Sequence, residues 1–142
     1  MMIELTQQTG MPPRSFVYER RSSTLTNPIP ALTSNYELLR WVVPNDRNHF
    51  LLYGLGTDQH LNSDYKWVVD GVELPINGSA RVGTPEEPYI FPEPIYVSGT
   101  VVLYITNDNT VDYPNSTIPA PPLLRTPYDE YPYECMIYGR CE

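Results

Sequence analysis

The sequence predicts an all-β fold, a small β-sandwich or jelly-roll-like barrel with extended N- and C-terminal arms. Three observations support this prediction. Short segments rich in β-branched and aromatic residues alternate with turn residues about every 8–12 positions, as in sandwiches and barrels. No stretch keeps a helical period over about eleven residues or more. The 16 prolines among the 142 residues gather towards the two ends, where they favour extended chain.

Residues 1–35 are expected to form the extended N-terminal arm. This stretch is polar and is interrupted by four prolines, which push the residues before them out of the helical region. Within it, residues 15–20 are predicted to form one short strand. An arm of this kind has no sheet of its own, so the strand is interpreted as one that adds to the sheet edge of a neighbouring molecule.

Residues 36–113 are expected to form the β-sandwich core. The segments predicted as strands or extended edges are 38–43, 50–55, 65–69, 72–76, 79–82, 89–91, 95–97 and 100–106. Asp70 and Gly71 separate two of these segments and are a strong signal for a type I′ hairpin. Residues 100–106 carry apolar side chains on both faces, which predicts a central strand.

Residues 114–142 are expected to form an extended tail rich in proline and tyrosine. Tyrosine offers a large contact area at low entropic cost, with a hydroxyl group for the rim of an interface. Leu123, Leu124, Met136 and Ile137 make the tail more apolar than a solvated segment needs, although a disordered tail is the alternative. An apolar, aromatic tail predicts contact with another surface.

Cys135 and Cys141 lie six residues apart near the C-terminal end. A disulfide would fit if the chain turned back at Tyr138 and Gly139. Free thiols are the default for a protein made in a cytoplasm. The sequence leaves both states open, and two cysteines alone cannot surround a zinc ion tetrahedrally.

The net charge of -8 argues against a nucleic-acid partner, which would require a basic stripe. No apolar run approaches the length of about 18 residues that a membrane span needs, so no membrane partner is expected. The first residues lack the basic and apolar regions of a signal peptide. We therefore expect synthesis in a host cytoplasm.

The charge is distributed unevenly along the chain. Residues 1–47 hold five arginines and four acids, whereas residues 48–142 hold four basic residues and thirteen acids. Copies of the chain would therefore attract one another, arm to body. Lys66 is the only lysine among the nine basic residues. Arginine suits protein interfaces better than lysine does, with codon bias as the alternative explanation.

Few residues suggest chemistry. His49, Asp58, His60 and Asp64 have metal-ligand side chains, but their spacing fits no metal motif, and polar loop residues explain them equally well. Two clusters of Asx residues, at 58–64 and 107–112, lack the spacing of a calcium loop. No nucleophile elbow, P-loop or zinc-protease motif occurs. We expect no enzymatic activity, no cofactor and no metal site.

One family resemblance stands out. The strand and turn pattern of residues 65–71, 81–84 and 91–107 is similar to that of the β-sandwich in tailed-bacteriophage virion proteins, above all capsid decoration (cement) proteins. The resemblance covers residues 60–110. It implies a homotrimer on the capsid surface of a virion, with arms that clamp neighbouring subunits of the major capsid protein.

The sequence therefore predicts a decoration protein that stabilises a phage head by bridging neighbouring capsid subunits. The expected interface residues, in the arm and in the tail, are Phe16, Tyr18, Arg20, Arg21, Tyr128, Tyr131 and Tyr133. Another virion component, such as a tail, neck or fibre-attachment protein, fits the same features. A carbohydrate-binding sandwich with Trp41 and Trp67 as stacking platforms is a further alternative, although both tryptophans lie in strand patterns that favour burial.

Overall fold

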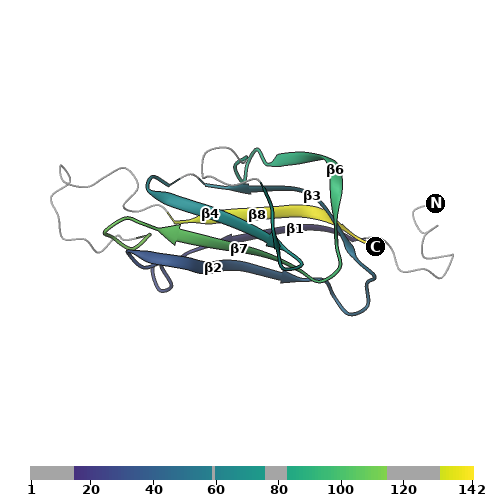
Figure 1. Ribbon diagram of the computed structural model, residues 1–142, viewed down its shortest axis with the longest axis horizontal. Coiled ribbons are helices and arrows are strands. Elements are labelled where there is room, and N and C mark those ends of the chain that lie inside the picture. The colour runs from purple at the N-terminus through teal and green to yellow at the C-terminus, as the bar shows by residue number, and fades with distance from the viewer. Residues whose placement is uncertain (1–14, 59, 76–82, 115–131) are drawn as a thin grey trace.

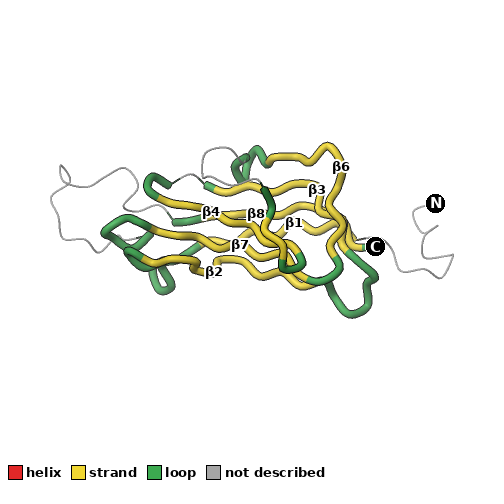
Figure 2. Tube along the Cα trace, viewed as in Figure 1, coloured by secondary structure: helices red, strands yellow, loops and turns green. Residues whose placement is uncertain are grey.

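The computed structural model describes residues 15–58, 60–75, 83–114 and 132–142, and this part of the chain is all-β, as predicted. Figure 2 shows strands joined by loops, with no helix among these residues. The strands are β1 (Ser15–Ser22), β2 (Thr33–Val42), β3 (Phe50–Thr57), β4 (Ser63–Val69), β5 (Val72–Glu73), β6 (Tyr89–Val97), β7 (Thr100–Asn107) and β8 (Glu134–Cys141).

These strands form two four-stranded antiparallel sheets, which make up a β-sandwich (Figure 1). Sheet 1 has the order β1-β8-β3-β6, and sheet 2 has the order β2-β7-β4-β5. β7 therefore lies between two neighbours, which confirms the prediction of a central strand at residues 100–106. Every pairing is antiparallel.

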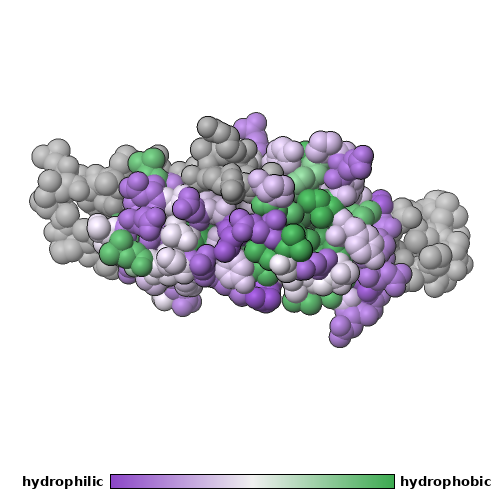
Figure 3. Space-filling model, viewed as in Figure 1, coloured by the Kyte–Doolittle hydropathy of each residue, from purple (hydrophilic) through white to green (hydrophobic). Residues whose placement is uncertain are grey.

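The core lies between the sheets and is built from alternate residues of each strand. Trp67 is fully buried on β4, and on β3 Phe50, also fully buried, packs against Trp41 with 4.4 Å between ring centroids. The largest fully buried side chains also include Tyr65, Tyr133, Leu52, Leu55, Leu103, Ile105 and Ile137. Figure 3 shows that the surface towards the viewer is mixed, with hydrophobic residues gathered beside the bend of β6.

The predicted hairpin at Asp70 and Gly71 is confirmed. The two residues have φ angles of 50° and 83°, and both central positions of a type I′ turn require positive φ. The Asp70 carboxylate also accepts hydrogen bonds from the backbone N–H groups of Ser98, Gly99 and Thr100 at 2.7–3.0 Å. It therefore fastens the β4–β5 hairpin to the turn between β6 and β7.

The predicted boundaries of the core were too narrow. Residues 15–22 are not an arm that joins a neighbour's sheet, because β1 pairs along its length with β8 of the same chain. β8 in turn lies between β1 and β3 and is a central strand of sheet 1, not part of an extended tail. Residues 1–14 and 115–131 lie outside the described part of the chain.

Two segments predicted separately, 89–91 and 95–97, belong to the single strand β6. Pro92 and Pro94 lie within it, and proline is tolerated there because β6 is an edge strand with one side unpaired. A register shift between Leu52 and Gly54 of β3 accommodates this region. The predicted strand at 79–82 lies outside the described residues.

The two cysteines are free thiols at opposite ends of β8. Six residues of extended chain separate their Cα atoms by about 20 Å, far beyond the reach of a disulfide. The chain does not turn back at Tyr138 and Gly139, because both continue the strand. Burial raises the pKa of Cys135 to about 12 and also raises that of Cys141, so both thiols are protonated at neutral pH.

The substitution Asp70→Asn tests the link between the two turns. Burial opposes ionisation of Asp70, but the N–H donors outweigh it and hold its pKa below the usual value. The charged form therefore stabilises the fold above about pH 4, and this contribution is lost as the pH falls through the folded-state pKa. Asn tolerates positive φ, so the turn itself is retained.

We expect Asp70→Asn to lower the free energy of unfolding by about 0.5–1 kcal/mol at pH 7, because solvent weakens these exposed bonds. Urea denaturation at pH 7 and pH 3 measures the effect. The difference between the two proteins should shrink at pH 3. An equal difference at both pH values would contradict the assigned role of the charge.

Candidate functional site: an aromatic face and a buried polar network

The outer face of sheet 1 carries a continuous row of large side chains across all four strands. Residues directly opposite on antiparallel strands point to the same face. Phe16 of β1 lies opposite Arg140 of β8, which lies opposite Leu51 of β3, which lies opposite Tyr96 of β6. Together with Tyr18 and Tyr138, which lie opposite each other in the next row, and with Tyr53 at the register shift of β3, they form what we call the aromatic face. Its members are Phe16, Tyr18, Leu51, Tyr53, Tyr96, Tyr138 and Arg140.

Ring contacts connect the aromatic face. Tyr138 lies at its centre, with ring centroids 6.5 Å from Phe16, 6.4 Å from Tyr18 and 5.5 Å from Tyr53. The Arg140 guanidinium lies 5.9 Å from the ring centroid of Tyr53, within cation–π distance. Phe16, Tyr18 and Tyr96 remain 57–65% exposed. A cluster of exposed phenylalanine and tyrosine, with a partly buried arginine beside it, has the composition that protein interfaces favour.

The segment 83–88 bounds the aromatic face on one side. Thr57 of β3 donates its N–H to the carbonyl of Gly83 at 2.8 Å, and the Tyr18 hydroxyl donates to the carbonyl of Pro85 at 3.2 Å. Arg20 forms an ion pair with Glu86. A Cβ atom on Gly56 would lie 2.3 Å from the Thr84 carbonyl oxygen, so the close approach of this segment requires glycine there.

The structure brings three of the predicted interface residues to this face or its border. Phe16 and Tyr18 belong to the aromatic face, and Arg20 lies at its border with the segment 83–88. Arg21 points to the other side of β1, where it forms an ion pair with Glu19. Tyr133 is fully buried, so the prediction of a surface anchor there was wrong. Tyr128 and Tyr131 lie outside the described residues.

Sequence reasoning missed the part of the aromatic face that comes from β3, β6 and β8. A period-two signal was present, because Leu51 and Tyr53, and likewise Tyr138 and Arg140, are spaced two residues apart. Tyr138 and Arg140 fall within residues 114–142, which the sequence predicts to be a tail, so the same spacing there did not predict a strand.

The edges of both sheets are protected against pairing with other strands. β1 carries the charged residues Glu19 and Arg21 on its inner side, β6 contains two prolines, and β2 has two register shifts. In the described part of the chain β5 is only two residues long. Inward charges, proline, bulges and short strands are the usual means by which proteins block edge pairing. Association through a face therefore fits this sandwich better than strand addition does.

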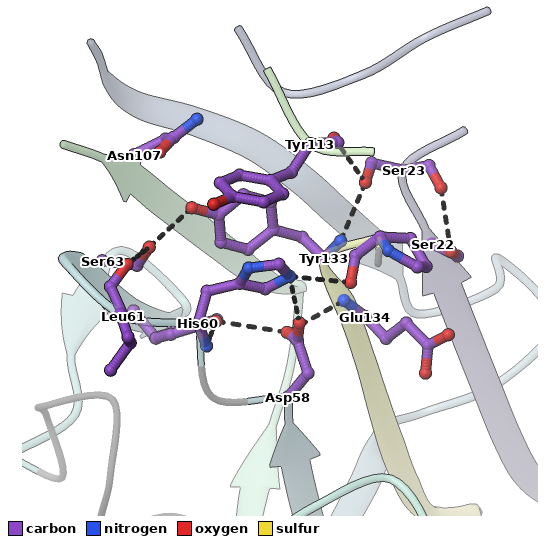
Figure 4. A network of polar contacts seen from close by, with 12 residues as sticks. Ser22, Ser23, Asp58, His60, Leu61, Ser63, Asn107, Tyr113, Tyr133 and Glu134 are labelled. Carbon is purple, nitrogen blue, oxygen red and sulfur yellow. Dashed lines mark hydrogen bonds and ion pairs between the residues drawn. The ribbon is translucent and has the colours of Figure 1, made fainter. Parts of the chain in front are cut away.

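A buried polar network lies at the end of the sandwich where β3 stops and β8 begins (Figure 4). The Asp58 carboxylate accepts hydrogen bonds from the Tyr65 hydroxyl at 3.2 Å and from the N–H of Glu134 at 3.0 Å. Its second oxygen lies 2.9 Å from Nε2 of His60. That nitrogen also lies 3.0 Å from the carbonyl oxygen of Pro132. Because both partners accept, Nε2 carries the proton.

Tyr133 extends the network towards the other loops. The His60 ring packs against Tyr133 and Tyr113, with centroid distances of 4.2 and 4.5 Å. The Tyr133 hydroxyl lies 2.5 Å from the Ser63 hydroxyl. The backbone N–H of Tyr133 donates to the Ser23 hydroxyl at 2.9 Å. Burial raises the pKa of Tyr133 to about 12 and also raises that of Tyr65, so both remain protonated donors at neutral pH.

The residue types Asp, His and Ser invite comparison with a hydrolytic triad. Nucleophilic catalysis by a serine requires a hydrogen bond between the serine hydroxyl and the histidine ring. It also requires a reaction site that a substrate can reach. Here the Ser63 hydroxyl hydrogen-bonds Tyr133 and the carbonyl of Leu61. His60, Ser63 and Tyr133 are only 3%, 7% and 0% exposed. The geometry is that of a structural network that joins loops from both sheets.

The residues considered for metal binding do not come together. His49 stacks on Tyr96 with ring centroids 4.5 Å apart and lies near Glu142, whereas His60 belongs to the buried network. Asp64 lies on β4, on the outer face of sheet 2. Among the described residues no group of three or more His, Cys, Asp or Glu side chains is arranged to hold a metal ion.

The described residues include no helix long and apolar enough to cross a bilayer. Trp67 is fully buried and Trp41 packs on Phe50, so Trp67 cannot serve as a stacking platform for a sugar.

No protein-family model matches the sequence, and no curated protein matches it significantly. The function must therefore be argued from the surface.

We expect Asp58→Asn to lower the free energy of unfolding by about 2 kcal/mol, because an NH2 group replaces the oxygen that faces Nε2 of His60, and the bonds at the other oxygen lose their charged acceptor. Urea denaturation of the full chain measures it. Asp108→Asn is the matched control, since Asp108 is exposed, and it should change stability by less than about 0.5 kcal/mol. Equal effects of the two substitutions would contradict a special role for Asp58.

Proposed function

We propose that this chain is a structural virion protein, a capsid decoration or cement protein that binds and stabilises a phage head by bridging neighbouring capsid subunits. The single observation that supports it most is the aromatic face of sheet 1. Phe16 is 65% exposed and Tyr18 is 57% exposed, and both lie beside Tyr138 on a rigid sheet. Such anchors typically supply most of the energy of a protein interface.

The preorganisation of the aromatic face also supports a binding role. Its side chains lie on four hydrogen-bonded strands, and five of them touch one another, so little conformational entropy is lost when a partner covers them. Arg140 is held against Tyr53 and forms an ion pair with Glu142. The partner that fits is a protein surface with apolar pockets for the exposed rings, and in the proposal it is the major capsid protein.

The proposal includes self-association as a homotrimer at the capsid surface, which follows from the resemblance to decoration proteins. Because the sheet edges are protected, we place the contacts in the faces of the sandwich. Measurement of the native mass by light scattering is the first test. A stable trimer supports the proposal, and a strict monomer at all concentrations contradicts its self-association.

Another virion component, such as a tail, neck or fibre-attachment protein, would use the same aromatic face. Copy number separates the two functions. Quantitative mass spectrometry of purified particles should find hundreds of copies per particle for a decoration protein. Dozens or fewer would instead assign the chain to the tail or neck, and its absence from particles would contradict both.

The substitution Phe16→Ser tests the face directly. We expect it to weaken binding to undecorated heads at least about tenfold, because Phe16 is the most exposed ring of the aromatic face and truncation of an aromatic anchor is costly. Binding is measured by co-sedimentation over a range of protein concentrations. The fold should be retained, because the Phe16 side chain is largely in solvent.

Val72→Ser is the matched control for this experiment. Val72 is 67% exposed, close to the 65% of Phe16, but it lies on β5 of the other sheet. We expect its affinity for heads to stay within about twofold of that of the unaltered chain. If both variants bind heads as well as the unaltered chain does, the aromatic face is not the attachment surface.

A further inference from the structure

The outer face of sheet 2 contains a shallow groove of about 490 Å³. It lies on the side of the sandwich opposite the aromatic face, because the core separates the two sheets. The groove runs across strands that are rigidly paired, so its shape is set by the sheet. Its lining residues are Asn35, Asp64, Tyr65, Lys66, Glu73, Tyr104 and Thr106.

Tyr104 occupies the centre of this face. It lies on β7, a central strand, with Glu37 of β2 opposite it on one side and Lys66 of β4 on the other. The Lys66 ammonium lies 5.5 Å from the centroid of the Tyr104 ring. Two residues further along β7, Thr106 lies opposite Asp64. One aromatic ring is thus surrounded by polar groups from three strands.

The polar groups supply both hydrogen-bond donors and acceptors. Asp64 and Glu73 only accept when ionised, Lys66 only donates, and Asn35 and Thr106 can do both. The two carboxylates and one ammonium leave no excess of positive charge, which disfavours phosphate or sulfate groups. Charged residues at the centre of the groove also disfavour a protein partner, whose interface core would be depleted of them.

We propose that this groove binds a neutral oligosaccharide. A pyranose ring presents an apolar C–H face, which suits the Tyr104 ring, and a rim of hydroxyl groups that both donate and accept. Asp64 and Glu73 accept hydrogen bonds from sugar hydroxyls, and Lys66 and Asn35 donate to them. Because the groove is shallow and lies on a sheet face, it takes a few sugar units of a longer chain.

This site differs from the carbohydrate platform that the sequence suggested. That hypothesis relied on Trp41 and Trp67, and Trp67 is wholly inside the core. The groove places a tyrosine of a central strand in that role, on the outer side of the sheet that contains Trp67. The inference does not depend on the proposed virion function, since the aromatic face and the groove share no residue.

The test uses the full chain and a printed array of neutral glycans, followed by NMR titration with the strongest hit. We expect a dissociation constant between micromolar and millimolar, and chemical-shift changes in the backbone amides of β4 and β7. Tyr104→Ala should weaken binding at least tenfold. Tyr96→Ala is the matched control, because Tyr96 is an exposed tyrosine of sheet 1, and it should leave the affinity within twofold.

Three outcomes would overturn the proposal. The first is no binding to any neutral glycan of the array at millimolar concentration. The second is binding that Tyr104→Ala leaves unchanged while its denaturation midpoint matches that of the unaltered chain. The third is shift changes confined to sheet 1. Lys66→Gln serves as a second variant, since it keeps a hydrogen-bond donor and should reduce the affinity less than Tyr104→Ala does.

Discussion

The end of the sandwich where β3 stops and β8 begins depends on the hydrogen bonds and the ion pair of the Asp58 carboxylate. The carboxylate receives hydrogen bonds from Tyr65 of sheet 2 and from Glu134 at the start of β8, and it pairs with His60 in the loop between the sheets. A buried carboxylate is costly unless its oxygens have partners. The three partners offset that cost only when β8 is in place. The position of β8 is therefore coupled to the loop after β3.

This coupling explains why sheet 1 can form an extended aromatic face at all. β8 brings Tyr138 and Arg140 between β1 and β3, and without it Phe16 and Tyr53 would have no ring between them. The strands at both edges carry charges or prolines, which block growth of the sheet by strand addition. The exposed apolar surface thus lies on a face with a fixed shape, away from the edges.

The sequence predicted the fold class, the type I′ hairpin and the central position of residues 100–106, because these depend on local pattern and turn chemistry. It did not predict the pairing of β1 with β8, which joins residues more than a hundred positions apart through contacts that no local pattern encodes. Proline near both segments favours extended chain and therefore predicts arms instead of paired strands. The buried role of Tyr133 was missed for a related reason, since its partners Ser23 and Ser63 are distant in sequence.

The two outer faces differ in chemistry because they carry different residue types over the same core. The aromatic face exposes the rings of Phe16, Tyr18 and Tyr96, which are readily covered by protein. The groove on sheet 2 surrounds one ring with carboxylates, an ammonium and a hydroxyl group. These groups stay in contact with water or with a ligand that carries many hydroxyl groups. Sheets in a sandwich pack about 10 Å apart, so a substitution on one outer face does not touch the other. A single sandwich can therefore attach through one face while the opposite face remains open to solvent.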